Sequence, residues 1–227
     1  MFNAKKQGLE GMEEVMDKKE NAPMWKRIAM SFFGVIITGF CIGAFQKANL
    51  GADPFACFVT GIANIFHSTY SVFYLIVTGT LLVGVFFVER HYIGIATLIN
   101  LFFTGMAADF MKNLLDGFFP APGMAARIGM MLFGIFGTCL GASVYFTADL
   151  GVSAYDAWSL IAAYKYKLLA FRVCRIISDS ICVLTGFICH VTIGAGTVIT
   201  ALFMGPVVQW FNTNLSEPFL YGHKLDR

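Results

Sequence analysis

Long apolar runs, each close to the length of a helix that crosses a lipid bilayer, follow one another along almost the whole chain. A bilayer core about 30 Å thick needs about 20 consecutive, mostly apolar residues in a helix. The run from Ile28 to Phe45 is the first of them. Of the 227 residues, 57% are hydrophobic and 13% are charged, and the mean hydropathy is +0.70. These values exclude an ordinary water-soluble domain and predict an integral membrane protein.

The apolar runs and the breaks between them predict an all-α protein with eight membrane segments in two four-segment halves. A linker at 117–126, with two prolines and two glycines, separates the halves. We expect a charged cytoplasmic tail at 1–27, membrane repeats at 28–116 and 127–215, and a short tail at 216–227. The expected segments are 28–47, 51–67, 70–89, 92–112, 127–147, 151–165, 169–189 and 192–212.

The two halves align without a gap at an offset of 100 residues. The phrase NLGADPFACF from Asn49 corresponds to DLGVSAYDAW from Asp149. Likewise, IGIATLINLFFTG from Ile93 corresponds to IGAGTVITALFMG from Ile193. Apolar composition alone gives scattered matches, and not two glycine-centred clusters in one register. Internal repeats of this kind are typical of transporters, whose binding sites lie between the repeats.

The second segment of each half decides how the repeats are related. Residues from Pro54 to Phe66 would form only ~20 Å of helix, which is short of the bilayer core. If the segment nevertheless crosses, the repeats are parallel, both termini are cytoplasmic, and only Lys47 and Arg90 of the loop cations face outward. If it is broken or re-entrant, each half crosses three times and the repeats are inverted. We expect the parallel arrangement.

Polar groups in the first repeated phrase predict two capped, interrupted helices. Asp53 precedes Pro54 as an N-cap, while Ser153 takes the same place in the second half with Asp156 three residues later. Acids at such breaks would also line a polar cavity between the halves, where they favour a cation, a proton or an amine. The candidate substrate-binding or ion-binding residues are Asn49, Asp53, Asn100, Asp149, Asp156, Trp158 and Asp179.

Small residues repeat in the fourth helix of each half. They predict close packing of this helix against its repeat mate, as small residues allow in membranes. Asn100 adds a polar group near the middle of the bilayer, where it must hydrogen-bond to another residue or line a water-filled pathway. The packing residues are Gly94, Thr97, Gly105, Gly194, Gly196, Thr197 and Gly205.

The halves differ most in their third helix, where Asp179 replaces Gly79. A deep carboxylate is costly unless it is paired, so Arg175, one turn earlier, is its expected partner. The alternative is a proton or substrate site at Asp179. Trp158 could stack on an organic cation, although ordinary packing explains it as well. Other tyrosines and tryptophans, Tyr70 among them, fall near expected span ends and are assigned to interfacial belts.

Several classes of function are excluded. The net charge of +2 is too small and scattered for a nucleic-acid-binding protein. The six cysteines lie in apolar segments without metal-ligand spacing, so we expect no metal and no cofactor. No nucleophile elbow, zinc-protease motif or phosphate loop is present, so we do not expect an enzyme.

The phrases NLGADPFACF and IGIATLINLFFTGMAAD, with the echo IGAGTVITALFMGP, resemble the YczE/YyaS/YitT-like family of bacterial membrane proteins. The resemblance covers residues 28 to 215. It implies a small multi-pass protein of a family often classed as transporters, one branch of which is linked to production of nonribosomal peptides and polyketides. The family favours Gly-Thr in the fourth helix, which Gly196 and Thr197 match, whereas the first copy has Ala96 before Thr97.

These features together predict a small secondary transporter or exporter in the bacterial cell membrane. One repeat would rock against the other around a small organic solute, and carboxylates would couple that motion to protons. The expected partners are therefore the lipid bilayer, the solute and protons; the oligomeric state is open. The alternative is a membrane scaffold that recruits or regulates cytoplasmic partners, such as biosynthetic enzymes, through the charged N-terminal tail.

Overall fold

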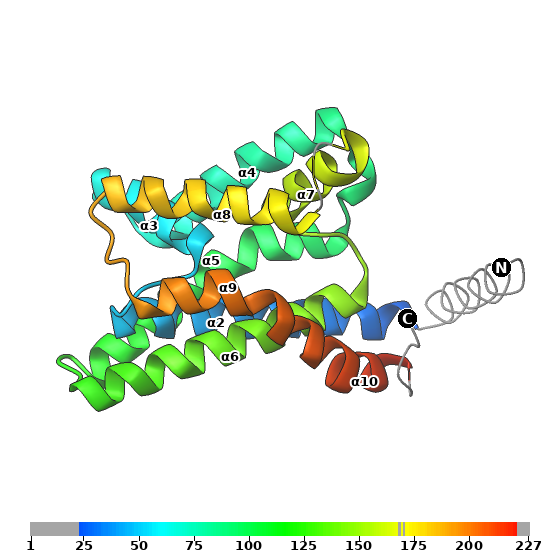
Figure 1. Ribbon diagram of the computed structural model, residues 1–227. Helices are drawn as coiled ribbons and strands as arrows, with labels where there is room; N and C mark the ends of the chain where they lie inside the picture. The colour runs from blue at the N-terminus through cyan, green and yellow to red at the C-terminus, as the bar shows by residue number, and fades with distance from the viewer. Residues whose placement is uncertain (1–22, 168, 170, 222–227) are drawn as a thin grey trace, which may run out of the picture.

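The computed structural model describes residues 23–167, 169 and 171–221, which form helices and no strand (Figure 1). Most of the predicted N-terminal tail, 1–22, and the end of the C-terminal tail, 222–227, lie outside the described residues. In chain order the elements are α2 (Met24–Ala48), α3 (Pro54–Ile65), α4 (Tyr70–Val88), the 3₁₀ helix η1 (Arg90–Tyr92), α5 (Ile95–Phe118), α6 (Met124–Ala148), α7 (Ala154–Leu160), the π-helix η2 (Ile161–Lys165), α8 (Phe171–Ile188), α9 (Ala195–Phe211), the π-helix η3 (Asn212–Ser216) and α10 (Glu217–Tyr221).

Helix length separates two kinds of element. Among the described helices, α2, α4 and α6 are long and apolar enough to cross a bilayer. α5 has 24 residues, but its second half carries Asp109, Lys112 and Asp116. α3 has only 12 residues, ~18 Å of helix, and α7 has 7 before it continues as η2. The second element of each half is therefore too short to cross a bilayer core of about 30 Å.

The helices form two layers (Figure 1). α2 packs against α5 and α6, and α6 packs against α9, which gives one layer. α3 packs against α4 and α8, and α4 packs against α7, which gives the other layer. Contacts between α4 and α5 join the layers on one side, whereas the described parts of α8 and α9 make little contact with each other.

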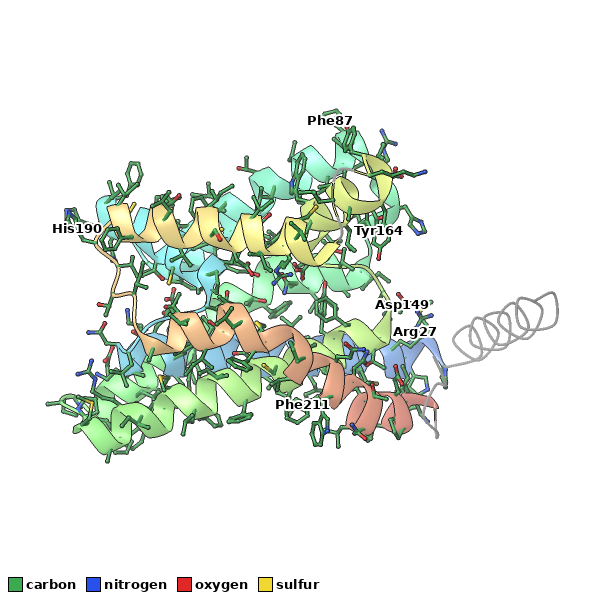
Figure 2. All side chains as sticks on the ribbon, in the orientation of Figure 1. Arg27, Phe87, Asp149, Tyr164, His190 and Phe211 are labelled. Atoms are coloured by element: carbon green, nitrogen blue, oxygen red, sulfur yellow. The ribbon has the colours of Figure 1, made fainter. Side chains whose placement is uncertain are left out.

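The first helices of the two halves, α2 and α6, run antiparallel. The Arg27 guanidinium, at the start of α2, donates to the carbonyls of Ala148 and Asp149 at the end of α6, at 2.8 and 2.7 Å. Arg127, at the start of α6, donates to Ala48 and Asn49 at the end of α2, at 2.7 and 2.8 Å. Figure 2 shows Arg27 beside Asp149. Parallel repeats require these helices to run in the same direction, so that expectation is wrong.

Glycines allow α2 and α6 to approach closely. A Cβ on Gly141 would lie 2.4 Å from the Thr38 hydroxyl oxygen and 2.7 Å from the Gly34 carbonyl oxygen. A Cβ on Gly34 would in turn lie 2.8 Å from the Gly141 carbonyl oxygen. Dispersion and close contact drive such helix pairs in lipid, where no hydrophobic effect separates helix from solvent. This crossing holds the two halves together.

The loops 49–53 and 149–153, which contain the repeated phrases, have matching conformations. Asn49 and Asp149 end their helices in the left-handed region, at φ 51° and 52°. Gly51 and Gly151 follow at φ 125° and 116°, a conformation that side chains disfavour. The chain turns sharply here and begins the short helices α3 and α7.

Each of these loops binds the start of the fourth helix of the opposite half. The Gly196 amide donates to the Leu50 carbonyl, and the Ala96 amide donates to the Leu150 carbonyl, each at 3.1 Å. Thr197 Oγ1 accepts from the Ala52 amide at 3.0 Å, and Thr97 Oγ1 donates to the Val152 carbonyl at 2.8 Å.

The repeated small residues therefore pack mainly against loops and against other helices, so the expected packing of α5 on α9 is wrong. Gly94 and Gly194 approach the carbonyls of Leu150 and Leu50, where a Cβ would lie 1.9 and 2.2 Å away. Gly105 lies against Ser71 and Tyr74 of α4, and Gly196 lies against Phe45 of α2. Gly205 faces open space. The loops, and not the other fourth helix, pack against these helix starts because the loop carbonyls and the first amides of each helix have no partners within their own segments and hydrogen-bond to each other.

Candidate functional site

A cavity of about 110 Å³ lies between the two helix layers and is lined by residues from each helix from α2 to α9. Its charged lining residues are Asp53, Asp156 and Arg175. Its polar lining includes Asn100, the hydroxyl groups of Tyr70, Tyr74, Tyr145 and Tyr155, and several threonines. The cavity therefore draws on both halves of the chain and on both loops that carry the repeated phrases.

One guanidinium joins two carboxylates at the wall of the cavity. Arg175 of α8 forms an ion pair through Nη1 with Asp156 Oδ1 of α7, and its Nε lies 3.4 Å from Asp179 Oδ1, one turn along α8. The side chains of Arg175, Asp156 and Asp179 are 28%, 10% and 15% exposed. Such shielded charges interact more strongly than surface pairs, and each depends on its partner.

Tyr155, the residue before Asp156 in α7, supports this ion pair. Its hydroxyl donates to Asp179 Oδ1 at 2.6 Å, and its ring lies 5.0 Å from the Arg175 guanidinium carbon. On the other side the ring stacks on Phe55 of α3, with centroids 4.7 Å apart. The cation–π contact and the hydrogen bond hold Arg175 and Asp179 in one arrangement.

Asp53 and Ser153 hold equivalent places at the starts of α3 and α7, as predicted. Asp53 Oδ2 accepts from the Ala56 amide at 3.3 Å, and Ser153 Oγ accepts from the Asp156 amide at 3.1 Å. Ser153 Oγ also donates to Asp156 Oδ2 at 2.8 Å. The N-cap predictions are confirmed. Asp53 also experiences repulsion from Asp179 and attraction from Arg175, so all these charges share one electrostatic field.

Asn100 lines the cavity and accepts a hydrogen bond from the Tyr74 hydroxyl through Oδ1, at 2.8 Å. Tyr74 is almost fully buried, and its ring packs edge-to-face on Phe55. The pair forms the wall built by α4 and α5. Asn100 is thus satisfied in part by a residue that the sequence did not single out.

Several residues that line the cavity carry a buried hydroxyl group without a hydrogen bond to any described residue. Tyr70 and Thr138, each 6% exposed, are two of them. Thr78, Thr104 and Tyr145 also lack a hydrogen bond of normal geometry, although Tyr74 lies near both threonines and Thr97 lies near Tyr145. Buried hydroxyls normally have a partner, so for Tyr70 and Thr138 that partner would be water or a polar ligand.

The assignment of Tyr70 to an interfacial belt is wrong, because its side chain is buried at the cavity. It begins α4, and the short α3 brings that start inward. The sequence also missed Tyr74, Thr138 and Tyr145. Thr138 had a signal, since it aligns with Thr38 at the repeat offset, but only the packing aims both threonines inward.

Besides Asp179, three predicted site residues lie outside the cavity lining. Asn49 and Asp149 end α2 and α6, where their carbonyls accept from Arg127 and Arg27. The Trp158 indole donates to the Leu81 carbonyl at 3.1 Å and lies against Gly84 of α4. In these positions the three residues make interhelical contacts.

Asp179 is not part of the cavity lining; it borders a second, larger hollow of about 540 Å³ between α8 and α9. Its walls are mostly apolar and include Leu184, Phe187 and Leu202. Such a surface suits lipid. No cluster of metal-ligating side chains occurs among the described residues.

Comparison with known proteins finds one matching family and one relative, and neither description states a function. Residues 25–213 match the profile of a family described as "Family of unknown function (DUF6198)". A Haemophilus influenzae protein described as "Uncharacterized protein" is 28% identical over 189 residues, which cover 82% of this chain and 84% of the relative. No solved structure matches the chain. The likeness to YczE/YyaS/YitT-like proteins remains a resemblance.

Proposed function

The chain belongs to DUF6198, a family of unknown function, and from the geometry of its cavity we propose that it is a small secondary transporter for an organic solute. The observation that carries this proposal is the polar, charged cavity to which each helix from α2 to α9 contributes. Charged groups at membrane depth are costly and usually mark a substrate or ion pathway. A site built by two halves suits a mechanism in which one half moves against the other.

In the proposed architecture, 28–116 and 127–215 are inverted repeats, each with three crossings and one half-helix. The first, third and fourth helices of each half cross, while α3 and α7 with η2 enter and turn back. The antiparallel α2 and α6 and the reciprocal hydrogen bonds of Arg27 and Arg127 support this relation. So do the reciprocal bonds from Ala96 and Gly196 to the opposite loops.

This architecture gives a consistent charge asymmetry across the membrane. The end that holds the start of α2 also carries Lys26, Arg27, Arg90, Lys165 and Lys167, whereas the opposite end carries Lys47, Lys112 and Arg127. The positive-inside rule then puts the first end in the cytoplasm. Six crossings return the chain to that side, so both termini are cytoplasmic. The parallel arrangement would put Arg90 outside and Lys112 and Arg127 in the cytoplasm. The inverted arrangement puts each of these three residues on the other side.

Alternating access would act at this cavity. Arg27 and Arg127 link the halves at opposite ends of the α2–α6 pair, so loosening one link while the other holds would open one face at a time. Protonation of Asp156 or Asp179 would weaken its attraction to Arg175 and free the α7–α8 contact. Proton binding is thereby coupled to movement of helices that line the site.

The test is proton flux in liposomes that contain a pH-sensitive dye. We expect solute-dependent proton movement with the native protein and at least a tenfold loss in Asp156→Asn or Asp179→Asn. Asp116→Asn is the matched control, because Asp116 pairs with Lys47 at the end of the bundle. Equal flux in all variants would reject the coupling role. If folded protein moved no solute, and deletion of 2–22 abolished partner recruitment, a scaffold would replace the transporter.

A further inference from the structure

Negative charge exceeds positive charge at the cavity. Asp53 and Asp156 line the cavity together with Arg175, and Asp179, outside the lining, lies 3.4 Å from the same guanidinium, the only one among the described residues of this cluster. With all four ionised the formal sum is −2. The helix starts capped by Asp53 and Ser153 offset roughly half a charge each. About one negative charge is left without compensation, which is costly at this depth.

The hydroxyl groups of Tyr70 and Thr138 give a second, independent indication of a ligand. Both residues are more than nine-tenths buried and line the cavity, and their hydroxyl oxygens have no hydrogen-bond partner among the described residues. They come from α4 and α6, one in each half. Hydroxyl and carboxylate oxygens around one space can accept hydrogen bonds from several N–H donors.

The cavity volume limits the size of that ligand. A cavity of about 150 Å³ accommodates benzene, and a water molecule takes about 30 Å³ of liquid. The volume of about 110 Å³ therefore suits roughly four or five non-hydrogen atoms or about four waters. A large amphiphile does not fit this space.

We propose that the cavity binds a small, hydrophilic, monovalent cation with several N–H donors, of the guanidinium or primary ammonium class. Its charge compensates the surplus carboxylate charge, and its N–H groups donate to Asp53 and to the hydroxyls of Tyr70 and Thr138. Arg175 stays paired with Asp156 and Asp179, so the ligand does not need to displace it. The inference rests on the proposed function, because it names the solute class for the same site.

Four small compounds separate the effect of charge from that of shape. Guanidinium is the probe; urea has its shape without the charge, tetramethylammonium has the charge without N–H donors, and acetate has the opposite charge. Isothermal titration of the purified full chain in detergent should give at least tenfold tighter binding of guanidinium than of the other three. Equal binding of urea or stronger binding of acetate would overturn the proposal.

The chain itself offers a variant that keeps the helix cap. Asp53→Ser copies Ser153, the capping residue at the equivalent place in the second half, and removes the carboxylate while it keeps an oxygen that can cap the helix. We expect guanidinium binding to weaken at least tenfold in Asp53→Ser and to stay unchanged in the control Asp116→Asn. Asp53→Asn gives a second test if Asp53→Ser does not fold. Unchanged binding in a folded Asp53 variant contradicts the proposal.

The hydroxyl variants distinguish a ligand contact from a structural role. Tyr70→Phe and Thr138→Val should each weaken guanidinium binding at least threefold, while the melting temperature of the ligand-free protein does not fall, because no protein hydrogen bond is lost. A structural hydroxyl would give the reverse result. Binding of guanidinium without flux in liposomes would retain this site and reject the transporter. Flux of a neutral or anionic solute without guanidinium binding would retain the transporter and reject this ligand class.

Discussion

Arg175 shows how much a single side chain decides in this molecule. Its guanidinium contacts Asp156 and Asp179 and lies over the ring of Tyr155, so it connects α7 to α8. The i, i+4 spacing of Arg175 and Asp179 is visible in the sequence, but the contact with Asp156 is not. Asp156 sits 19 residues earlier, and only the turn between α7 and α8 brings it to Arg175.

Replacing Arg175 by Met should therefore be strongly destabilising. Removing one partner of a shielded ion pair leaves the other charge uncompensated, at a cost of about 3–5 kcal/mol. The double variant Arg175→Met/Asp156→Asn should lose less than Arg175→Met alone, because it removes one of the stranded charges. Chemical unfolding in one detergent measures both losses.

The control for this experiment is Lys165→Met. Lys165 pairs with Glu89 at 3.2 Å, but both side chains are more than one-third exposed. Such surface pairs contribute about 0–1 kcal/mol. An Arg175→Met loss no larger than that of Lys165→Met, or a double variant less stable than Arg175→Met, would show that the guanidinium does not compensate these carboxylates.

Among the elements, the crossing of α2 and α6 is the contact that most constrains the two halves. The sequence supplied glycines on both helices, and composition alone could not tell which of them meet. Gly34 and Gly141 meet at the crossing, whereas Gly129 of the same helix α6 has open space around it. A glycine in a membrane helix therefore has a packing role only where a neighbouring backbone comes close.

Gly141→Ala and Gly129→Ala should have opposite effects on stability. The Gly141 Cβ would lie 2.7 Å from a backbone oxygen, so α2 and α6 must separate, at a cost of roughly 1–3 kcal/mol or more. At Gly129 nothing lies within 4 Å, and alanine favours the helix by up to about 1 kcal/mol. Thermal unfolding of the two variants measures the difference, and equal melting temperatures would reject the close crossing.

At the scale of the whole molecule, the question is which way each helix crosses. The sequence predicted two aligned halves, and their alignment fits the reciprocal contacts of Arg27 and Arg127. It did not predict their relative direction correctly. That direction depends on whether residues 51–67 cross the bilayer. The amino-acid composition of this short segment does not show whether the chain continues to the other side or turns back.

Cysteine labelling of intact cells tests the inverted arrangement. In a Cys189→Ser background, since Cys189 alone of the described cysteines is not buried, Gly123→Cys should react with an impermeant maleimide from outside. His91→Cys should react only after the membrane is opened. With parallel four-span halves, His91→Cys would react from outside and Gly123→Cys only after the membrane is opened. Each site is therefore the control for the other. That pattern would reject inverted repeats.

The sequence by itself determined that this chain is helical, with apolar helices that could span a membrane, and that capped helix starts and a paired Asp179 lie within apolar surroundings. These features are local, because hydropathy, capping and i, i+4 spacing act within a few residues. The tertiary structure decided that α2 and α6 run antiparallel, that the small residues of α5 and α9 meet loops, and that Tyr70, Thr138 and Asp156 share one cavity. Those relations join residues tens of positions apart, and in lipid, where most helix faces are equally apolar, only close packing and the pairing of buried polar groups select among the possible neighbours.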